Sequence, residues 1–346
     1  RGVGQVEDCM RLQMAVAAER GAPDASDGCQ WLVAQSMGGG KAREMSVSKE
    51  VAEFGLQPVP WGGVAARLSA GGDVLAADKD TSLSGDLAVH GRPYCLLPLP
   101  SSSGLPIHVN GFFELSSNRR DIWYGDDLVG AGKMRAEWNC ALLVDVVAPS
   151  YIKLLSEVRT QLGGGDARYF ELWPHHRPVE PWGTLVDTLY AALVDLPVLY
   201  TEASGGKWVS PREAVFHEDG GDASPSPVHT ALLRGGMPLV HVPPTIVALL
   251  RTAAAIKGVS LQTADPRTVR RWLLADTHAA VRQSHLSQEE GLALLQLCTR
   301  DFATAGGVQA HELRGLRLLP LADGKLGLID ASGGLPVLLC PEGDRL

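Results

Sequence analysis

The strongest candidate for chemistry is a pair of arginines within residues 114–123, which read Glu-Leu-Ser-Ser-Asn-Arg-Arg-Asp-Ile-Trp. Arg119 and Arg120 follow an extended run of the chain, so we expect them on a loop where a strand ends. Their guanidinium groups are planar, permanently charged donors that suit a phosphate group. The alternative is an ordinary ion pair, because charged loop residues are usually solvated or paired. The carboxylates available for it are Asp121, Asp126, Asp127 and Glu137.

Two Gly-Lys sequences suggest a phosphate-binding loop, Gly38-Gly-Gly-Lys41 and Gly130-Ala-Gly-Lys133. A P-loop also requires an earlier glycine at a fixed spacing and a serine or threonine after the lysine. Gln35 and Asp127 occupy the earlier positions, and neither lysine is followed by a hydroxyl residue. We therefore interpret both sequences as ordinary turns.

Histidines are a weaker candidate for chemistry. His175 and His176 could bind a metal ion together with His217, which would suit a metal hydrolase. Adjacent histidines usually point in different directions, and no His-Glu-x-x-His sequence accompanies them. A solvated loop before Pro178 explains the pair more simply, so we expect no metal site in this chain.

Two extended runs are predicted to position the arginines. Residues 94–100 and 105–115 read as strands joined by Ser101-Ser-Ser-Gly104, a connection typical of a β-hairpin. In the second strand Ile107 and Val109 share one face, because side chains alternate along a strand. This pattern predicts one buried face and one polar face, with the arginines just beyond the strand.

A long helix is predicted after the arginines. From residue 133 to residue 162 apolar side chains recur at helical spacing, and Pro149 must kink or restart the helix. An amphipathic run over residues 6–18 predicts a short N-terminal helix. Residues 56–85 are rich in glycine and proline and are expected to be mainly loop.

The expected fold class is α/β, of the mixed α+β kind. It comprises a mixed sheet with the β-hairpin and the long kinked helix, followed by a second α/β unit. The glycine run 163–165 ends the helix and marks the main division. We therefore expect an N-terminal helix and loop over residues 1–29, an α/β unit over 30–165 and a second unit over 166–346. Further helices are predicted at 182–194, 243–256, 266–275 and 287–303, and a terminal hairpin at 316–319 and 326–329.

Composition limits the class of protein. Of the 346 residues 45% are hydrophobic, but no uninterrupted apolar run is long enough to span a membrane. The net charge of −8 makes nucleic acid a poor main partner. The six cysteines form no Cys-x-x-Cys pair, which fits a reducing compartment. We expect a cytoplasmic protein without membrane or nucleic-acid partners. Because the first residue is Arg rather than Met, we also expect a piece of a longer protein.

Several sequence runs resemble the repeated region of the sacsins, which are giant co-chaperones. The similar runs are Leu97-Pro-Leu-Pro100, Gly104-Leu-Pro-Ile-His-Val-Asn-Gly-Phe112, Leu115-Ser-Ser-Asn-Arg-Arg-Asp-Ile-Trp123, Glu137-Trp-Asn139, Ala148-Pro149, Pro197-Val-Leu-Tyr200, Lys207-Trp-Val-Ser210 and Leu318-Leu-Pro-Leu-Ala-Asp-Gly324. The resemblance covers most of residues 30–330 and is most specific between 95 and 149.

The resemblance implies a chaperone function. Sacsin repeats begin with an ATP-binding domain similar to that of the ninety-kilodalton heat-shock chaperones, and this chain resembles the segment that follows it. The resemblance implies that Arg119 reaches the γ-phosphate of ATP and acts as the catalytic arginine, with Asn118 and Arg120 beside it at the phosphate. ATP and Mg²⁺ would be held by a domain upstream, and no cofactor by this fragment. Implied partners are client proteins and the seventy-kilodalton heat-shock chaperone system.

Two departures from the chaperone pattern leave alternatives open. Arg120 stands where the heat-shock chaperones have an acidic residue, so either Arg119 or Arg120 is the phosphate ligand. The asparagine helix and the Asp-x-Gly-x-Gly loop that hold Mg-ATP are absent from this sequence. The rival hypothesis is therefore a protein-interaction or structural module without enzymatic activity, which retains only the chaperone-like fold.

Overall fold

The computed structural model describes residues 6–15, 28–70, 89–125, 129–217, 226–275, 286–302, 310–321 and 323–329. The contacts divide the chain into two compact units. Unit 1 comprises Arg1–Val198 and Pro243–Val259, and unit 2 comprises Leu199–Val242 and Ser260–Leu346. Helices and mixed sheets occur together, which confirms the predicted mixed α/β class. The predicted division at residues 163–165 lies within unit 1.

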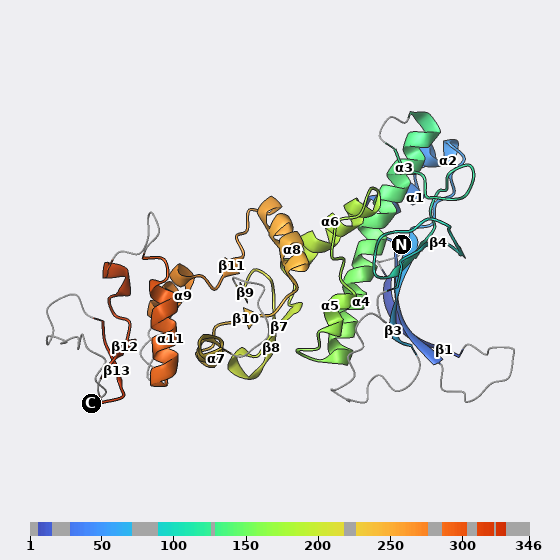
Figure 1. Ribbon diagram of the computed structural model, residues 1–346. Helices are drawn as coiled ribbons and strands as arrows, with labels where there is room; N and C mark the ends of the chain where they lie inside the picture. Colours follow the sequence, from blue (N-terminus) through green and yellow to red (C-terminus); the bar gives the residue numbers. More distant parts are fainter. Residues whose placement is uncertain are drawn as a thin grey trace. The chain divides into compact units, whose positions relative to one another are not determined.

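A six-stranded mixed sheet forms one layer of unit 1 (Figure 1). In spatial order its strands are β1 (Val6–Ala15), β2 (Gly28–Met37), β3 (Trp61–Ala70), β6 (His108–Gly111), β4 (Pro93–Cys95) and β5 (Leu97–Pro98). Neighbouring strands are antiparallel except β4 and β6, which pair in parallel. Two sequence predictions are wrong here. The expected N-terminal helix is strand β1, and part of the expected loop 56–85 is strand β3. Both segments pair along β2, and such pairing overrides local propensity.

The predicted hairpin between residues 94 and 115 is also wrong. The chain turns at Leu96, which has a positive φ of 63°, and the short strand β5 folds back on β4. It then loops around to pair β6 in parallel with β4. The physical reason lies in Pro100 and Pro106, because proline has no N–H to donate to an antiparallel ladder between the two predicted strands.

One long helix covers a face of the sheet (Figure 1). Helix α3 (Gly130–Leu142) continues through the π-helical turn η1 (Leu143–Val147) into α4 (Ala148–Leu162). The predicted interruption at Pro149 is confirmed and takes the form of this π-helical turn. Proline lacks an N–H and its ring crowds the carbonyl four residues earlier, so a wider turn before it relieves the clash. The buried residues Leu32, Val64 and Val109 line the covered face of the sheet.

Five other helices lie among the described residues of unit 1. Two short ones, α1 (Gly40–Ser46) and α2 (Lys49–Glu53), follow strand β2. Helix α6 (Trp182–Leu193) packs on α4, and α8 (Pro244–Ile256) packs on α6. The predicted helices at 182–194 and 243–256 are thereby confirmed. The short helix α5 (Arg168–Glu171) also contacts α4.

Unit 2 contains three small sheets and three longer helices among its described residues. Its parallel sheet has the order β10 (Leu239–Val240), β9 (Val215–Phe216) and β11 (Gln262–Thr263), and β7 (Leu199–Thr201) pairs with β8 (Lys207–Val209). The helices are α7 (Pro227–Arg234), α9 (Pro266–Leu274) and α11 (Gln288–Thr299). The antiparallel strands β12 (Leu319–Pro320) and β13 (Leu326–Gly327) confirm the predicted terminal hairpin.

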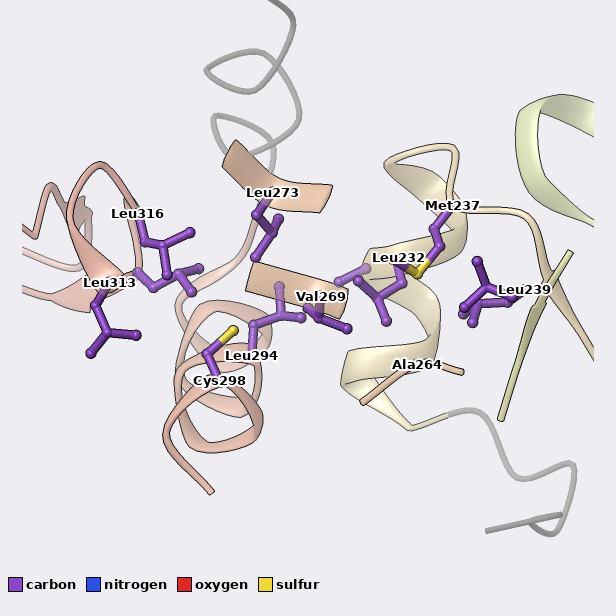
Figure 2. Packing of buried hydrophobic residues seen from close by; sticks show 13 residues of the cluster. Leu232, Met237, Leu239, Ala264, Val269, Leu273, Leu294, Cys298, Leu313 and Leu316 are labelled. Atoms are coloured by element: carbon purple, nitrogen blue, oxygen red, sulfur yellow. The ribbon is translucent and has the colours of Figure 1, made fainter. Parts of the chain in front are cut away.

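An apolar core joins the helices of unit 2. Figure 2 shows side chains of α7, α9 and α11 gathered in one cluster, with Leu313 and Leu316 beside them. Val269, Cys298 and Leu316 have no exposed surface. Burial raises the pKa of the Cys298 thiol to about 12, in keeping with its place in the apolar core.

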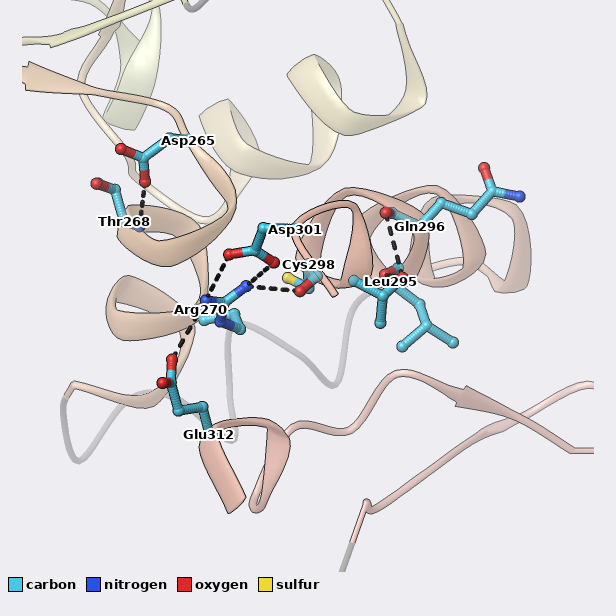
Figure 3. A network of polar contacts seen from close by, with 9 residues as sticks. Asp265, Thr268, Arg270, Leu295, Gln296, Cys298, Asp301 and Glu312 are labelled. Carbon is cyan, nitrogen blue, oxygen red and sulfur yellow. Dashed lines mark hydrogen bonds and ion pairs between the residues drawn. The ribbon is translucent and has the colours of Figure 1, made fainter. Parts of the chain in front are cut away.

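One buried arginine crosses this core (Figure 3). The Arg270 side chain is only 4% exposed. Its Nη1 donates to the Cys298 carbonyl at 2.7 Å and to Asp301 Oδ1 at 2.7 Å, and its Nη2 donates to Asp301 Oδ2 at 2.9 Å. Nη2 also donates to Glu312 Oε2 at 3.2 Å. Arg270 therefore ties helix α9 to the end of α11 and to the 3₁₀ turn Ala310–Leu313.

We expect Arg270→Ala to lower the free energy of unfolding of unit 2 by about 2–3 kcal/mol. Removing one member of a buried ion pair typically costs about 3–5 kcal/mol. We expect a smaller loss for Arg270 because the Asp301 side chain is 28% exposed. Water can therefore reach its carboxylate once the guanidinium is removed. Urea denaturation with hydrogen exchange of α11 as the local signal measures the loss. Lys325→Ala is the matched control, since its ion pair with Asp323 is exposed. Equal midpoints for the two variants would contradict the prediction.

Candidate functional site

Residues 114–123, here called the arginine loop, form a tight turn. The backbone pairs Leu115 with Ile122 in a single antiparallel bridge. The Ser116 N–H donates to the Asp121 carbonyl at 2.9 Å, and the Trp123 N–H donates to the Glu114 carbonyl at 2.8 Å. The two arms of the loop are thus joined by main-chain hydrogen bonds, which restrict the conformations open to its tip.

Side chains within the loop close its tip. Asn118 Oδ1 accepts from Ser116 Oγ at 2.8 Å and from the Arg120 N–H at 3.0 Å. The Arg119 N–H donates to the Ser116 carbonyl at 2.7 Å, and Arg119 has a positive φ of 52°. A left-handed backbone is uncommon for a residue other than glycine, and such strain persists where the surroundings enforce it. Asn118 therefore holds the turn that presents Arg119 and Arg120.

Helix α3 anchors the base of the loop through Asn139. This side chain is fully buried, and its Oδ1 accepts from the Glu114 N–H at 2.9 Å. Its Nδ2 donates to the carbonyls of Glu114 at 2.7 Å and Trp123 at 2.8 Å. Beside it, Trp138 Nε1 donates to the Phe112 carbonyl at 2.9 Å. The role of Asn139 could not be read from a motif, although an amide on an otherwise apolar helix face is a signal of a structural role.

The predicted site residues Asn118, Arg119 and Arg120 lie together at the exposed tip. Within the described residues neither arginine forms a salt bridge. Glu137, one of the expected partners, lies 3.2 Å from Lys41 Nζ and 3.8 Å from Lys133 Nζ. Another expected partner, the Asp121 carboxylate, accepts a hydrogen bond from Ser101 Oγ at 3.2 Å. The remaining two, Asp126 and Asp127, lie outside the described residues. The tip is therefore chemically suited to an external anion.

The Gly-Lys sequences do not form a phosphate site. At the start of α1 the position of an anion is already taken by Asp145, whose Oδ2 accepts from the Ala42 N–H at 3.0 Å. A Cβ at Gly39 would stand 2.6 Å from the Asp145 carbonyl oxygen, and one at Gly40 would stand 2.7 Å from the carboxylate. These glycines allow the close approach of the chain to Asp145. Gly130 opens helix α3 with a positive φ of 58°.

His175 and His217, two histidines of the metal-hydrolase hypothesis, each have contacts within their own unit. His175 and His176 belong to unit 1 and His217 to unit 2. His175 meets Thr245 Oγ1 at 2.9 Å and the Phe170 carbonyl at 3.0 Å, while His217 stacks on His229 at 4.8 Å between ring centres. Burial lowers the pKa of His217 and of His229. In the described ranges no three His, Cys, Asp or Glu side chains are arranged to hold a metal ion.

Among the helices that the structure describes, none combines the length and apolar character needed to cross a bilayer.

Comparison with known proteins gives one informative match. The chain is 29% identical over 331 residues to sacsin of Homo sapiens. The aligned part is 91% of this chain and 7% of human sacsin, so the chain is sacsin-like over most of its length and spans a small part of that relative. No protein-family model matches the chain. No solved structure matches it either.

Proposed function

We propose that this sacsin-like chain is a chaperone or co-chaperone segment that couples an ATP-binding domain to the handling of client proteins. The observation that carries the proposal is the arginine loop, which presents two exposed guanidinium groups on a turn held by its own hydrogen bonds. A rigid support lowers the entropy that the arginines lose when they bind a phosphate. We assign the contact with the ATP γ-phosphate to Arg119.

The chemistry proposed for Arg119 is electrostatic. When bound, ATP with Mg²⁺ supplies the phosphoryl group, and its adenine and metal are held by a separate domain. The guanidinium would donate to the phosphate oxygens, and its charge stabilises them most when negative charge develops in the transition state. Asn118 holds the tip and Asn139 holds the base, so both would be positioning residues.

We expect the 346-residue chain alone to bind ATP with a Kd weaker than about 10 μM. An exposed basic tip offers phosphate contacts without a concave pocket for the base, and the chain carries a net charge of −8. Isothermal titration calorimetry of the chain with Mg-ATP measures the affinity. A Kd below about 10 μM, which corresponds to about −7 kcal/mol, would contradict the proposal that the nucleotide site is built by another domain.

The second candidate function is a protein-interaction module without ATPase activity. It is favoured by the position of Arg120, where the heat-shock chaperones that the sequence resembles have an acidic residue. Under this hypothesis the arginine loop would contact an acidic partner protein and would have no effect on ATP turnover. Client proteins and the seventy-kilodalton heat-shock chaperone system remain proposed partners, and the cytoplasm remains the proposed location.

A further inference from the structure

A hollow lies on the face of the unit 1 sheet that the long helix does not cover. Its volume is about 340 Å³. Aromatic rings and small residues line it: Trp31, Trp61, Tyr94 and His108 are its aromatic groups, and Gly63 and Ala65 lie among them on strand β3. The residues of β2 that line it are Trp31, Val33 and Gln35, which alternate with the buried Leu32 and Ala34. The hollow is therefore a property of one sheet face.

The small residues create the hollow. Gly63 and Ala65 point to the same face of β3 as Trp61, and they leave space between larger neighbours. A Cβ at Gly63 would stand 2.7 Å from the Ala34 carbonyl oxygen and 3.1 Å from Gln35 Cβ. Gly63 thus allows Gln35 to lie against the strand, and the hollow stays open above both residues.

The aromatic groups are held in fixed positions. Trp31 stacks on His108 with 5.4 Å between ring centres and 20° between ring planes. Tyr94 meets the other side of this pair edge-on, 5.5 Å from the His108 ring centre. Trp61 Nε1 donates to Gln35 Oε1 at 3.3 Å. Aromatic walls of this kind offer apolar contact at a low cost in side-chain entropy.

The polar groups of the hollow have their acceptors occupied. Gln35 Oε1 accepts from Trp61, Asn110 Oδ1 accepts from the Leu96 N–H at 3.2 Å, and His108 Nδ1 accepts from the Arg92 N–H at 3.1 Å. Each assignment of oxygen or tautomer follows from the N–H that it meets. Among the described residues, Gln35 Nε2, Asn110 Nδ2 and His108 Nε2 donate no hydrogen bond to another protein group, and none of the three is a buried polar atom without a partner. The hollow thus presents donors and aromatic surface.

We propose that this hollow binds a proline-rich segment of a partner protein in the polyproline II conformation. Such a segment offers backbone carbonyl acceptors, has no N–H at its prolines and packs flat apolar rings on aromatic walls. Its chemistry complements donors that lack acceptors. The width of the hollow is similar to the length of one polyproline turn. Strands β2, β3 and β6 together span about 10 Å at a strand spacing of about 4.8 Å, and one polyproline turn is about 9 Å long.

A single-stranded nucleic acid is the competing occupant, since bases also stack on aromatic side chains. Two arginines flank the hollow, Arg67 opposite Trp31 and Arg92 beside His108. Nucleic acid is disfavoured because no Lys or Arg is among the described residues that line the hollow itself. Burial and the neighbouring Arg92 lower the pKa of His108, which disfavours the charged form of its ring. Binding of a proline segment should therefore change little between low and high salt, in contrast to binding of a phosphate backbone.

The direct test is titration of the chain with acetylated, amidated decaproline, followed by tryptophan fluorescence and calorimetry. A (Gly-Ser)₅ peptide of equal length is the control ligand, and a uridine decamer tests the competing occupant. We expect saturable binding of decaproline with a Kd below about 1 mM and no saturation by the control. No saturation by decaproline, or displacement of decaproline by the uridine decamer at low salt, would overturn the proposal. The experiment uses no ATP, so its result is independent of the proposed function.

Two variants locate the binding site. Gln35→Glu keeps the acceptor for Trp61 and removes the amide donors, and Ala65→Phe fills the hollow without removing a fold contact. We expect each to weaken decaproline binding about tenfold or more, while Gln57→Glu, at an exposed loop position outside the hollow, leaves it unchanged. Urea midpoints establish that each variant is folded. If either variant is unfolded, Tyr94→Ala takes its place, with Tyr124→Ala as the matched exposed control. Unchanged binding in folded variants would show that decaproline binds elsewhere.

Discussion

Replacing Arg119 by alanine is expected to reduce ATP turnover about 10³-fold or more in a sacsin-like chain that includes the ATP-binding domain. Loss of an arginine that stabilises the transferred phosphoryl group typically costs about 10³–10⁵ in rate. An exposed ion pair contributes only about 0–1 kcal/mol, so the two roles differ greatly in size. Nucleotide affinity should change little, because the charge is most effective in the transition state. Steady-state hydrolysis and equilibrium nucleotide binding measure the two quantities separately.

Arg120→Ala is the matched variant for this experiment. Both arginines are exposed at the tip, but only Arg119 has the left-handed backbone, so the turn holds the two residues in different backbone conformations. We expect Arg120→Ala to retain most of the activity. If Arg120→Ala lowers ATP turnover and Arg119→Ala does not, the phosphate contact belongs to Arg120. If the unchanged protein hydrolyses ATP and neither variant is slower, the arginine loop has no phosphate role and the interaction-module hypothesis gains.

The second large effect concerns stability. Trp138→Ala is expected to lower the free energy of unfolding by about 3–5 kcal/mol, the usual cost of removing a large aromatic side chain from a core. Trp138 has no exposed surface, and its loss would also leave the Phe112 carbonyl without the Nε1 donor. Urea denaturation followed by circular dichroism measures the change.

Trp123→Ala is the internal comparison, with an expected loss on the order of 1–2 kcal/mol. Trp123 is half-buried at the end of the arginine loop, where the Arg135 guanidinium lies 5.4 Å from its ring centre. A cation over an accessible ring contributes about 0.5–1 kcal/mol. Equal urea midpoints for the two tryptophan variants, with equal slopes, would show that Trp138 is not a main support of the core.

The sequence predicted helices better than strands. Helical spacing over residues 133–162 and 182–194 corresponds to real helices, because each of these segments buries its own apolar face. Strand β1 was mistaken for a helix since its stabilising partner, β2, lies outside any local window. The parallel pair β4–β6 was mistaken for a hairpin because strand direction depends on where the chain turns. That turn lies at Leu96, a residue type that carries no turn signal.

Only some features of the candidate site could be predicted from the sequence. The charges of Arg119 and Arg120 and their place after a strand could be recognised from the sequence alone. The support of the loop could not, because Asn139 reaches both Glu114 and Trp123 across a turn and a helix start. The hollow on the sheet could not be predicted either. Its walls come from β2, β3, β4 and β6, and β3 was expected to be loop.

The π-helical turn at Leu143–Val147 also affects how sequences of this kind should be aligned. A π-turn is equivalent to one residue inserted into an otherwise regular α-helix. It shifts the rotational phase between Trp138 and Asn139, which support the arginine loop, and Tyr151, which is fully buried and donates to the Leu172 carbonyl. In a relative with an uninterrupted helix, a gap-free alignment matched at one end would misassign every residue at the other. A one-residue gap within 143–147 would align the residues correctly on both sides of the π-turn. The placement of this gap therefore decides which residue of the relative is matched to Asn139.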